Sequence, residues 1–213
     1  MTSSHRLPAG LILLRHGETV GNRQQLWTGW SDTALSEVGR EQVSRTAARL
    51  ERDSLGVVGL YSSPTGRAWK TALSIGQVTH LRPVRDESLR EMHFGELEAI
   101  RSEHFQADHP EVYARWQDRT DEGFCWPAGE SRFQFRARVR DTVLRLATAH
   151  PGEIILLATH SGFIRMALAH FVPHRFGEWW NVRIDNCSFT HLLVDGDAMA
   201  QVPTFNDISH LAD

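Results

Sequence analysis

The strongest hydrophobic signals along the chain are two short apolar runs. Residues 11–14 read Leu-Ile-Leu-Leu, and residues 154–158 read Ile-Ile-Leu-Leu-Ala. Runs of this length without a polar interruption are typical of strands that are covered on both faces of a parallel sheet. We expect a further strand over 57–61 and a third short one within 84–89.

Segments with helical periodicity lie between these strands. The first spans 36–52, where Ser36 can cap the helix and Glu37 lies in its first turn. The second opens at Ser63-Pro64, with Pro64 in its first turn, and reaches about residue 78. The other predicted helices span 131–150 and 161–171, and the segments 188–194 and 199–202, joined through 195–197, predict a closing hairpin.

Strands that alternate with helices predict a three-layer α/β/α domain around a mainly parallel central sheet. The length of 213 residues fits a single domain, 1–213. Residues of about 96–130 interrupt the alternation as a helical, aromatic-rich insertion. Its aromatic side chains either cover the substrate over the active site or form a local core of the insertion. They are Phe105, Tyr113, Trp116, Phe124 and Trp126.

Composition and charge narrow the classes of partner. The formal net charge of −3 argues against non-specific binding of nucleic acid. The two cysteines, Cys125 and Cys187, form no CxxC pattern and indicate a reduced intracellular protein. Residues 1–10 lack the apolar core of a signal peptide, and the run 11–14 is too short to span a membrane. We therefore expect a cytoplasmic protein without a membrane partner.

Polar residues follow both apolar runs. The first run leads into Arg15-His16-Gly17 and the last into Thr159-His160-Ser161-Gly162. In open α/β sheets, ligands bind outside the carboxyl ends of the strands. One histidine at a strand end is usually structural, but two histidines, each followed by a glycine within two residues, favour a shared site. Gly17 and Gly162 would let the backbone approach a ligand closely.

Two further residues suit this site. Arg67 is expected in the first turn of the helix after the strand 57–61, where free N–H groups and the helix dipole attract anions. With Arg15, His16 and His160 it predicts a site for a dianionic phosphoryl group. Beside a bound phosphate, the carboxyl group of Glu91 is favoured in its protonated form and can protonate a leaving alkoxide.

A metal site is the rival interpretation for a chain with twelve histidines. However, the sequence has no HExxH motif and no paired Cys/His spacing. His170 and His174 stand four residues apart, but Pro173 interrupts the helix between them. We therefore expect neither a metal ion nor another cofactor.

Motifs along nearly the whole chain occur in a specific order. They are Leu14-Arg15-His16-Gly17-Glu18-Thr19 with Asn22; Thr28-Gly29-Trp30-Ser31-Asp32 with Leu35-Ser36 and Gly39; Ser62-Ser63-Pro64 with Arg67 and Thr71-Ala72; Leu89-Arg90-Glu91 with Phe94-Gly95; Gly129-Glu130-Ser131; Thr159-His160-Ser161-Gly162; and Asn206-Asp207 before His210-Leu211. An Arg-His-Gly triplet alone is weak evidence. The full set in this order resembles the histidine phosphatase superfamily, which includes the cofactor-dependent phosphoglycerate mutases.

The resemblance implies a phosphoglycerate mutase-like fold and a phosphohistidine intermediate. His16 would attack phosphorus, and water would then hydrolyse the phosphohistidine. Arg15, Arg67 and His160 would hold the phosphoryl oxygens, and Glu91 would protonate the leaving oxygen. His16 must be neutral to attack, and nearby arginines would favour that state by lowering its pKa. The further contacts to phosphate or substrate would be Asn22, Thr28, Gly29 and Ser161.

Two activities of this family compete. The segment 28–32 is mutase-like, but Met92 stands where mutases carry an arginine directly after the catalytic glutamate. Mutases also carry a pair of arginines in the insertion that bind the glycerate carboxylate, but around Trp116 the chain has only Arg115 and Arg119, and it is shorter than typical mutases. Weaker retention of phosphoglycerate would let water intercept the phosphohistidine. We therefore expect a phosphatase that acts on a small-molecule phosphate ester, with a mutase as the alternative.

Substrate, subfamily and oligomeric state stay open, and a homodimer is one possibility. Leu97-Glu98-Ala99 stands where such phosphatases often read Trp-Glu-Gly, and Ser161 where they often have glycine. The Gly129-Glu130-Ser131 element and the chain length are similar to α-ribazole-5′-phosphate phosphatases and sugar-phosphate phosphatases. A non-catalytic relative that only binds phosphorylated ligands is a third hypothesis. The retained nucleophile, acid and phosphate-binding residues argue against it.

Overall fold

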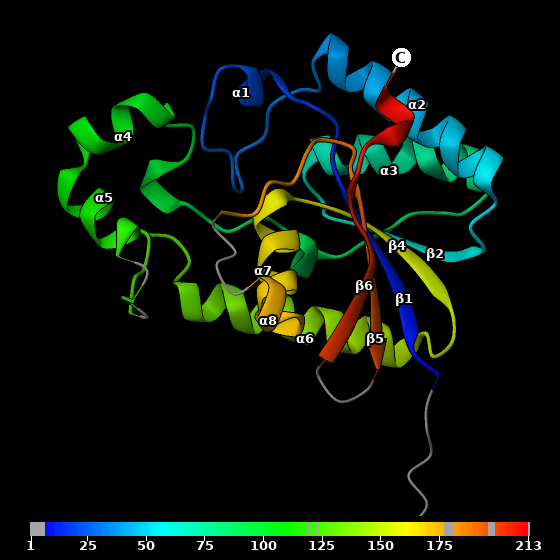
Figure 1. Ribbon diagram of the computed structural model, residues 1–213. Coiled ribbons are helices and arrows are strands. Elements are labelled where there is room, and N and C mark those ends of the chain that lie inside the picture. Colours follow the sequence, from blue (N-terminus) through cyan, green and yellow to red (C-terminus); the bar gives the residue numbers. More distant parts are fainter. Residues whose placement is uncertain (1–6, 119, 122, 177–180, 196–198, 213) are drawn as a thin grey trace, which may run out of the picture.

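The computed structural model describes residues 7–118, 120–121, 123–176, 181–195 and 199–212. In chain order the elements are β1 (Ala9–Arg15), α1 (Val20–Arg23), α2 (Glu37–Asp53), β2 (Val57–Ser62), α3 (Gly66–Thr79), β3 (Val84–Arg85), the 3₁₀ turns η1 (Glu87–Leu89) and η2 (Gly95–Leu97), α4 (Ser102–Asp108), α5 (Pro110–Gln117), α6 (Arg132–Ala149), β4 (Ile154–Thr159), α7 (Ser161–Phe171), α8 (Pro173–Phe176), β5 (Phe189–Asp195), β6 (Met199–Asp207) and the 3₁₀ turn η4 (Ser209–Leu211). Figure 1 shows how these elements surround a central sheet. Among the described residues, no helix is both long and apolar enough to cross a membrane.

The strands form one six-stranded sheet in the order β3-β2-β4-β1-β5-β6. The first four of these run parallel, and β5 is antiparallel to both of its neighbours. The prediction of a mainly parallel sheet is therefore confirmed. β1 and β4 are adjacent, and their register pairs Arg15 with Thr159 at the carboxyl ends. His16 and His160 consequently leave the sheet side by side.

The alternation of side chains along β1 divides the core between two helical layers. Leu11 and Leu13 pack in a cluster with residues of α6 and α7, whereas Ile12 and Leu14 pack with residues of α2 and α3. All four side chains are at most 4% exposed. A strand covered on both faces needs apolar residues at every position, which explains the uninterrupted run.

The element boundaries confirm most of the predicted helices and correct one detail. The hydroxyl of Ser36 caps α2 by accepting a hydrogen bond of 2.9 Å from the N–H of Gly39. α3 begins at Gly66 with Thr65 as its N-cap, so Pro64 precedes the helix and does not lie in its first turn. Arg67 does lie in that first turn. The predicted hairpin is formed by β5 and β6, and the joining residues 196–198 lie outside the described part of the chain.

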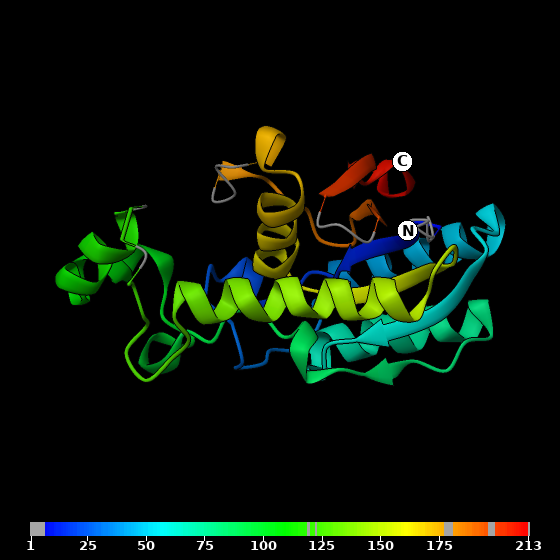
Figure 2. The same ribbon diagram turned by 90° about the horizontal axis from the view of Figure 1, so that it is seen from below.

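The insertion forms a lobe beside one end of α6. Both views show α4 and α5 on the side of the molecule away from the far ends of α2 and α3 (Figures 1 and 2). Trp27 packs edge-to-face against Phe105, Trp116 and Trp126, with ring centroids 5.1, 5.0 and 5.4 Å away. Phe105 and Trp126 are each 1% exposed. These aromatic rings therefore form a local core, one of the two roles expected for them.

Candidate active site

His16 is a buried side chain at the end of β1, 4% exposed, and its ring centroid lies 5.2 Å from that of His160. Its Nδ1 lies 2.8 Å from the carbonyl oxygen of Gly17. Because a carbonyl oxygen only accepts, Nδ1 carries the proton and Nε2 keeps its lone pair. Burial lowers the pKa of His16 well below 6.5, and the charges of Arg67 and Arg15 lower it further. The expected effect of the arginines is thus confirmed, with burial as the larger cause.

His160 is 1% exposed and is held by hydroxyl groups. Its Nε2 lies 2.8 Å from Oγ of Ser63 and 3.3 Å from Oγ1 of Thr65. Its Nδ1 is buried and has no hydrogen-bond partner. When Ser63 donates to Nε2, the proton of the neutral ring is on Nδ1, where it is free for a ligand.

Arg15 and Arg67 are each anchored through their terminal nitrogens. Nη1 of Arg15 donates to the carbonyl oxygen of Ile184 at 2.7 Å. Burial and the charge of Arg165 lower the pKa of Arg15 to about 10, which leaves the group charged at neutral pH. Nε of Arg15 and Nε of Arg67 are both buried without a partner. With Nδ1 of His160 they make three unpaired donors, and because such donors are unfavourable when buried, they favour an anionic ligand.

The loop 28–32 surrounds the Arg67 guanidinium. Nη2 donates to the carbonyl oxygens of Thr28 at 3.1 Å and Gly29 at 2.6 Å. Nη1 donates to the carbonyl oxygen of Ser31 at 2.7 Å and to Oδ1 of Asp32 at 3.1 Å. In this structure Thr28 and Gly29 therefore hold the arginine that was predicted to bind phosphate.

Glu98 holds the same loop from the other side. Its carboxylate accepts hydrogen bonds from the N–H groups of Gly29, Trp30 and Ser31, from the hydroxyl of Ser31 and from the N–H of Phe94. Both polar backbone groups of Gly29 are thus engaged by the protein, the N–H by Glu98 and the carbonyl by Arg67. Burial opposes the ionisation of Glu98, but the hydrogen bonds outweigh it and lower its pKa below 4.5.

Glu91 is 6% exposed and lies against the first turn of α7. Its Oε2 accepts a hydrogen bond of 2.8 Å from the N–H of Gly162, and its Oε1 accepts one of 2.9 Å from its own neighbour Met92. The backbone carbonyl of Glu91 accepts from Trp30 and Arg138. Arg138 in turn forms two hydrogen bonds with Glu130, of 2.9 and 2.7 Å. The Gly129-Glu130-Ser131 motif thus supports the segment that carries Glu91.

The two glycines after the histidines stand where a side chain would not fit. A Cβ atom at Gly17 would lie 2.7 Å from the carbonyl oxygen of Gly39 and 2.7 Å from Cγ2 of Val43. A Cβ atom at Gly162 would collide with the carboxylate of Glu91. Both glycines make room for groups of the protein itself, and the close approach of a ligand to their backbone stays a prediction.

Asn22 and Ser161 complete the predicted set. Oδ1 of Asn22 accepts from the N–H of Thr19 at 3.1 Å and from Nδ2 of Asn186 at 3.3 Å. Asn186 also donates to the carbonyl oxygen of His16 at 2.9 Å, so it connects Asn22 to the strand end. Ser161 begins α7 directly after His160.

A cavity of about 280 Å³ adjoins Glu91. Glu91, Ser161, Gly162 and Arg165 line one part of it, and the remaining lining is apolar. The apolar lining residues are Trp27, Met92, Phe94, Trp116, Trp126 and Phe135. Met92, which stands where mutases carry arginine, is therefore part of the apolar wall. Trp116 and Trp126 also show that the insertion contributes to this cavity.

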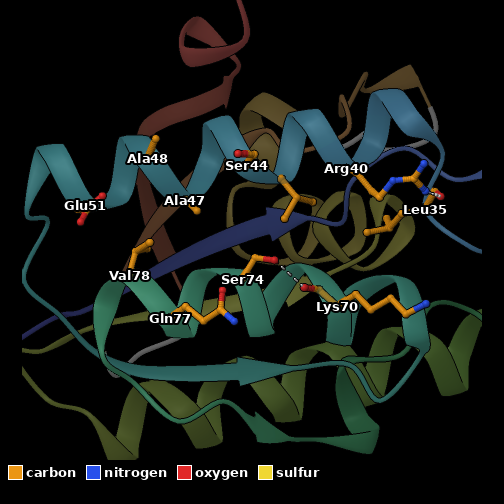
Figure 3. A pocket seen from close by; sticks show the side chains of 11 residues that line it. Leu35, Arg40, Ser44, Ala47, Ala48, Glu51, Lys70, Ser74, Gln77 and Val78 are labelled. Atoms are coloured by element: carbon orange, nitrogen blue, oxygen red, sulfur yellow. Dashed lines mark hydrogen bonds between the residues drawn. The ribbon is translucent and has the colours of Figure 1, made fainter.

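A larger hollow of about 570 Å³ lies between α2 and α3. Figure 3 shows Arg40 and Lys70 at one end of it and Glu51 towards the other. None of the predicted site residues lines this groove. The cavity beside Glu91 is therefore the candidate substrate site, although it is the smaller of the two.

The histidine pair considered as a metal site is divided between two helices. α7 ends at Phe171 and α8 begins at Pro173, so His170 and His174 do not share one helix. Within the described ranges, no group of three or more His, Cys, Asp or Glu side chains is placed to hold a metal ion.

Comparison with known proteins assigns the family. The model of the histidine phosphatase superfamily (branch 1) matches residues 11–207. The chain belongs to this superfamily. It is 33% identical to glucosyl-3-phosphoglycerate phosphatase of Mycobacterium tuberculosis, over 85% of this chain and 84% of that protein. The structure of Bacillus stearothermophilus YhfR superposes with a TM-score of 0.85 at 27% identity, covering 96% of this chain and all of that one.

The chain spans little more than half the length of some of its relatives. A bifunctional protein of Mycobacterium tuberculosis is 30% identical over 99% of this chain, which spans only 57% of that protein.

The fold of the chain is phosphoglycerate mutase-like. A phosphoglycerate mutase from Bacillus anthracis superposes with a TM-score of 0.84 at 19% identity.

Sequence reasoning missed the residues that hold this site together. Glu98 and Arg138 have backbone groups from distant segments as partners, so no local pattern marks them. Asn186 was missed for the same reason. Arg165 had a detectable signal, because it follows Ser161 by four residues and so shares its face of the helix.

Proposed function

We propose that the protein is a phosphomonoesterase that hydrolyses a small phosphorylated metabolite through a phosphohistidine on His16. The observation that carries this proposal is the hydrogen bond from Nδ1 of His16 to the carbonyl oxygen of Gly17. It leaves Nε2 as the unprotonated nitrogen, and the lowered pKa keeps the ring neutral. A neutral imidazole with a free lone pair is the form that can attack phosphorus.

The first step transfers the phosphoryl group to the enzyme. Nε2 of His16 attacks phosphorus, the N–P bond forms and the P–O bond to the leaving group breaks. Glu91 gives its proton to the leaving oxygen. The unpaired donors of Arg15, Arg67 and His160 bind the phosphoryl oxygens and stabilise the charge that develops on them.

The second step returns the enzyme to its starting state. Water attacks phosphorus and gives a proton to Glu91, and the N–P bond breaks to release inorganic phosphate. Both Glu91 and the neutral His16 are restored. The residues of the chain perform both steps without a metal ion.

A mutase has less support at this site. Met92 forms part of the apolar wall, and Arg115 is engaged by Asp121 at 2.9 Å and by the carbonyl oxygen of Gly123. Arg119, the other arginine considered as a carboxylate ligand, lies outside the described residues. The phosphatase names among the relatives agree with hydrolysis.

The test is to trap the intermediate with p-nitrophenyl phosphate as substrate. Quenching in alkali preserves a phosphohistidine, and peptide mass spectrometry should place one phosphoryl group on His16. His16→Ala should abolish both the phosphopeptide and turnover. The matched control is His104→Ala, because His104 is 56% exposed on α4, and this variant should behave as the parent does. Full turnover by His16→Ala, or a phosphoryl group on another residue, would overturn the proposal.

A further inference from the structure

The cavity beside Glu91 contains one cation that the proposed phosphoryl transfer does not use. Arg165 lies on α7, four residues after Ser161, and both side chains line the cavity with Glu91. With about 280 Å³ the cavity is near the small end of ligand pockets, which measure roughly 300–1,000 Å³. Because it adjoins the residue proposed to protonate the leaving oxygen, it is placed to receive the leaving group.

Within the described part of the chain, the guanidinium of Arg165 is held by the protein at only one of its three nitrogens. Its Nε donates to the carbonyl oxygen of Val182 at 2.6 Å. Among the described residues, its two terminal nitrogens have no hydrogen-bond partner and its charge has no ion pair. Anchoring at Nε leaves Nη1 and Nη2 as a pair of parallel donors, a geometry that matches the two oxygens of a carboxylate.

The local charge balance also favours an anion. Burial lowers the pKa of Arg165, and Glu91 is the group that opposes this shift. Arg165 in turn lowers the pKa of Arg15, after burial, so the two cations repel each other. Glu91 is the carboxyl group that acts on both cations, whereas Asp185 acts on Arg15 alone, and Glu91 must hold a proton at the moment of transfer. A negative group on the substrate would therefore balance part of the positive charge of Arg15 and Arg165. A neutral leaving group would not.

We propose that the leaving group of the substrate fills this cavity and carries a carboxylate that binds Nη1 and Nη2 of Arg165. The apolar part of the leaving group would lie against the rings of Trp27, Trp116 and Trp126. The substrates are then phosphate esters of hydroxy acids. This proposal rests on the proposed function for the direction of the leaving group, but its binding step can be tested separately.

Phosphoserine and phosphoethanolamine form a matched pair of probes, since they differ only in the carboxylate. The wild-type protein should have the higher kcat/KM for phosphoserine. Arg165→Gln should lower kcat/KM for phosphoserine on the order of 10–100-fold and change that for phosphoethanolamine less than about threefold. Arg165→Lys retains the charge without the paired donors and should restore part of the loss.

The control variant is Arg140→Gln, since Arg140 is 46% exposed on α6 and does not line the cavity, and this variant should leave kcat/KM for both substrates unchanged. Thermal unfolding of each variant shows whether the fold is retained. Equal losses on both substrates would mean that Arg165 only supports the structure, and no preference of the wild type for phosphoserine would mean that the cavity does not bind a carboxylate. Either result overturns the inference.

Calorimetric binding to the His16→Ala variant separates this inference from the proposed function. Tighter binding of phosphoserine than of phosphoethanolamine, lost in the double variant His16→Ala/Arg165→Gln, supports the carboxylate site even if the parent hydrolyses neither compound. Absence of turnover of p-nitrophenyl phosphate would overturn the proposed phosphomonoesterase and leave the carboxylate site standing. Equal binding of the two compounds would overturn the role of Arg165.

Discussion

Substitution of Glu98 by glutamine tests how strongly the site depends on the loop 28–32. Oε1 of Glu98 accepts hydrogen bonds from Trp30 and Phe94, and Oε2 accepts from the N–H of Gly29 and from the N–H and hydroxyl of Ser31. The glutamine amide has only one accepting oxygen. Whichever way the amide is turned, its NH₂ group faces the donors that one carboxylate oxygen binds in the parent, and it cannot accept hydrogen bonds from them. A hydrogen bond to a charged group contributes about 1.5–3 kcal/mol. Loss of two of them would cost about 3–6 kcal/mol.

Water reaches part of this carboxylate, because Glu98 is only partly buried, and takes over some of the lost hydrogen bonds. We therefore expect Glu98→Gln to lower the free energy of unfolding by about 2–4 kcal/mol, a large share of the roughly 5–15 kcal/mol of an ordinary domain. Urea denaturation near neutral pH measures this. Because the loop holds Arg67, kcat/KM should fall as well.

The pH dependence offers a second measurement on the same variant. The pKa of folded Glu98 is below its ordinary value of 4.5. Its contribution to stability is therefore complete above pH 4.5 and is lost as the pH falls through the lower folded value. Glu98→Gln lacks this group, so its stability should fall less steeply with acid than that of the parent.

Glu96→Gln is the matched control, since Glu96 is exposed in η2, two residues away. It should change the free energy of unfolding by less than about 0.5 kcal/mol. If Glu98→Gln is as stable as this control, the carboxylate of Glu98 does not hold the loop.

Three further predictions concern the chemistry of the site. Arg67→Lys should lower the rate by about 10²–10³, since lysine cannot hold the loop carbonyls and an anion together; a change of only a few-fold would exclude Arg67 from charge stabilisation. In an NMR titration, the His16 imidazole should stay neutral well below pH 6.5 because its folded pKa is lowered, and protonation near pH 6.5 would contradict this. Treatment with EDTA should leave turnover unchanged, whereas a loss that zinc or magnesium reverses would establish a metal requirement.

The sequence alone determined the layers of the fold and the strand ends that carry the polar residues. Burial on both faces demands apolar residues throughout β1 and β4, and a histidine just after such a run can only stand at the sheet edge. These signals are local, and they sufficed to predict His16 and His160. Arg67 was predicted from its place in the first turn of a helix after a strand, and Glu91 from the need for an acid beside a phosphate, but the periodicity of the chain does not reveal the contacts of either residue.

Only the tertiary structure decided how these residues are held. The register between β1 and β4 places the two histidines side by side, and register depends on packing far from the motifs. Glu98 was noted only as part of Leu97-Glu98-Ala99, where Leu97 and Ala99 depart from the family pattern. Ala99 adopts a φ of 64°, where a glycine would be unstrained. Four of the five hydrogen bonds of Glu98 come from the loop 28–32, which is distant in sequence, and the fifth comes from Phe94, four residues away. Long-range backbone partners of this kind leave no periodic trace, so folding was needed to reveal both the loop that holds Arg67 and the cavity with Arg165.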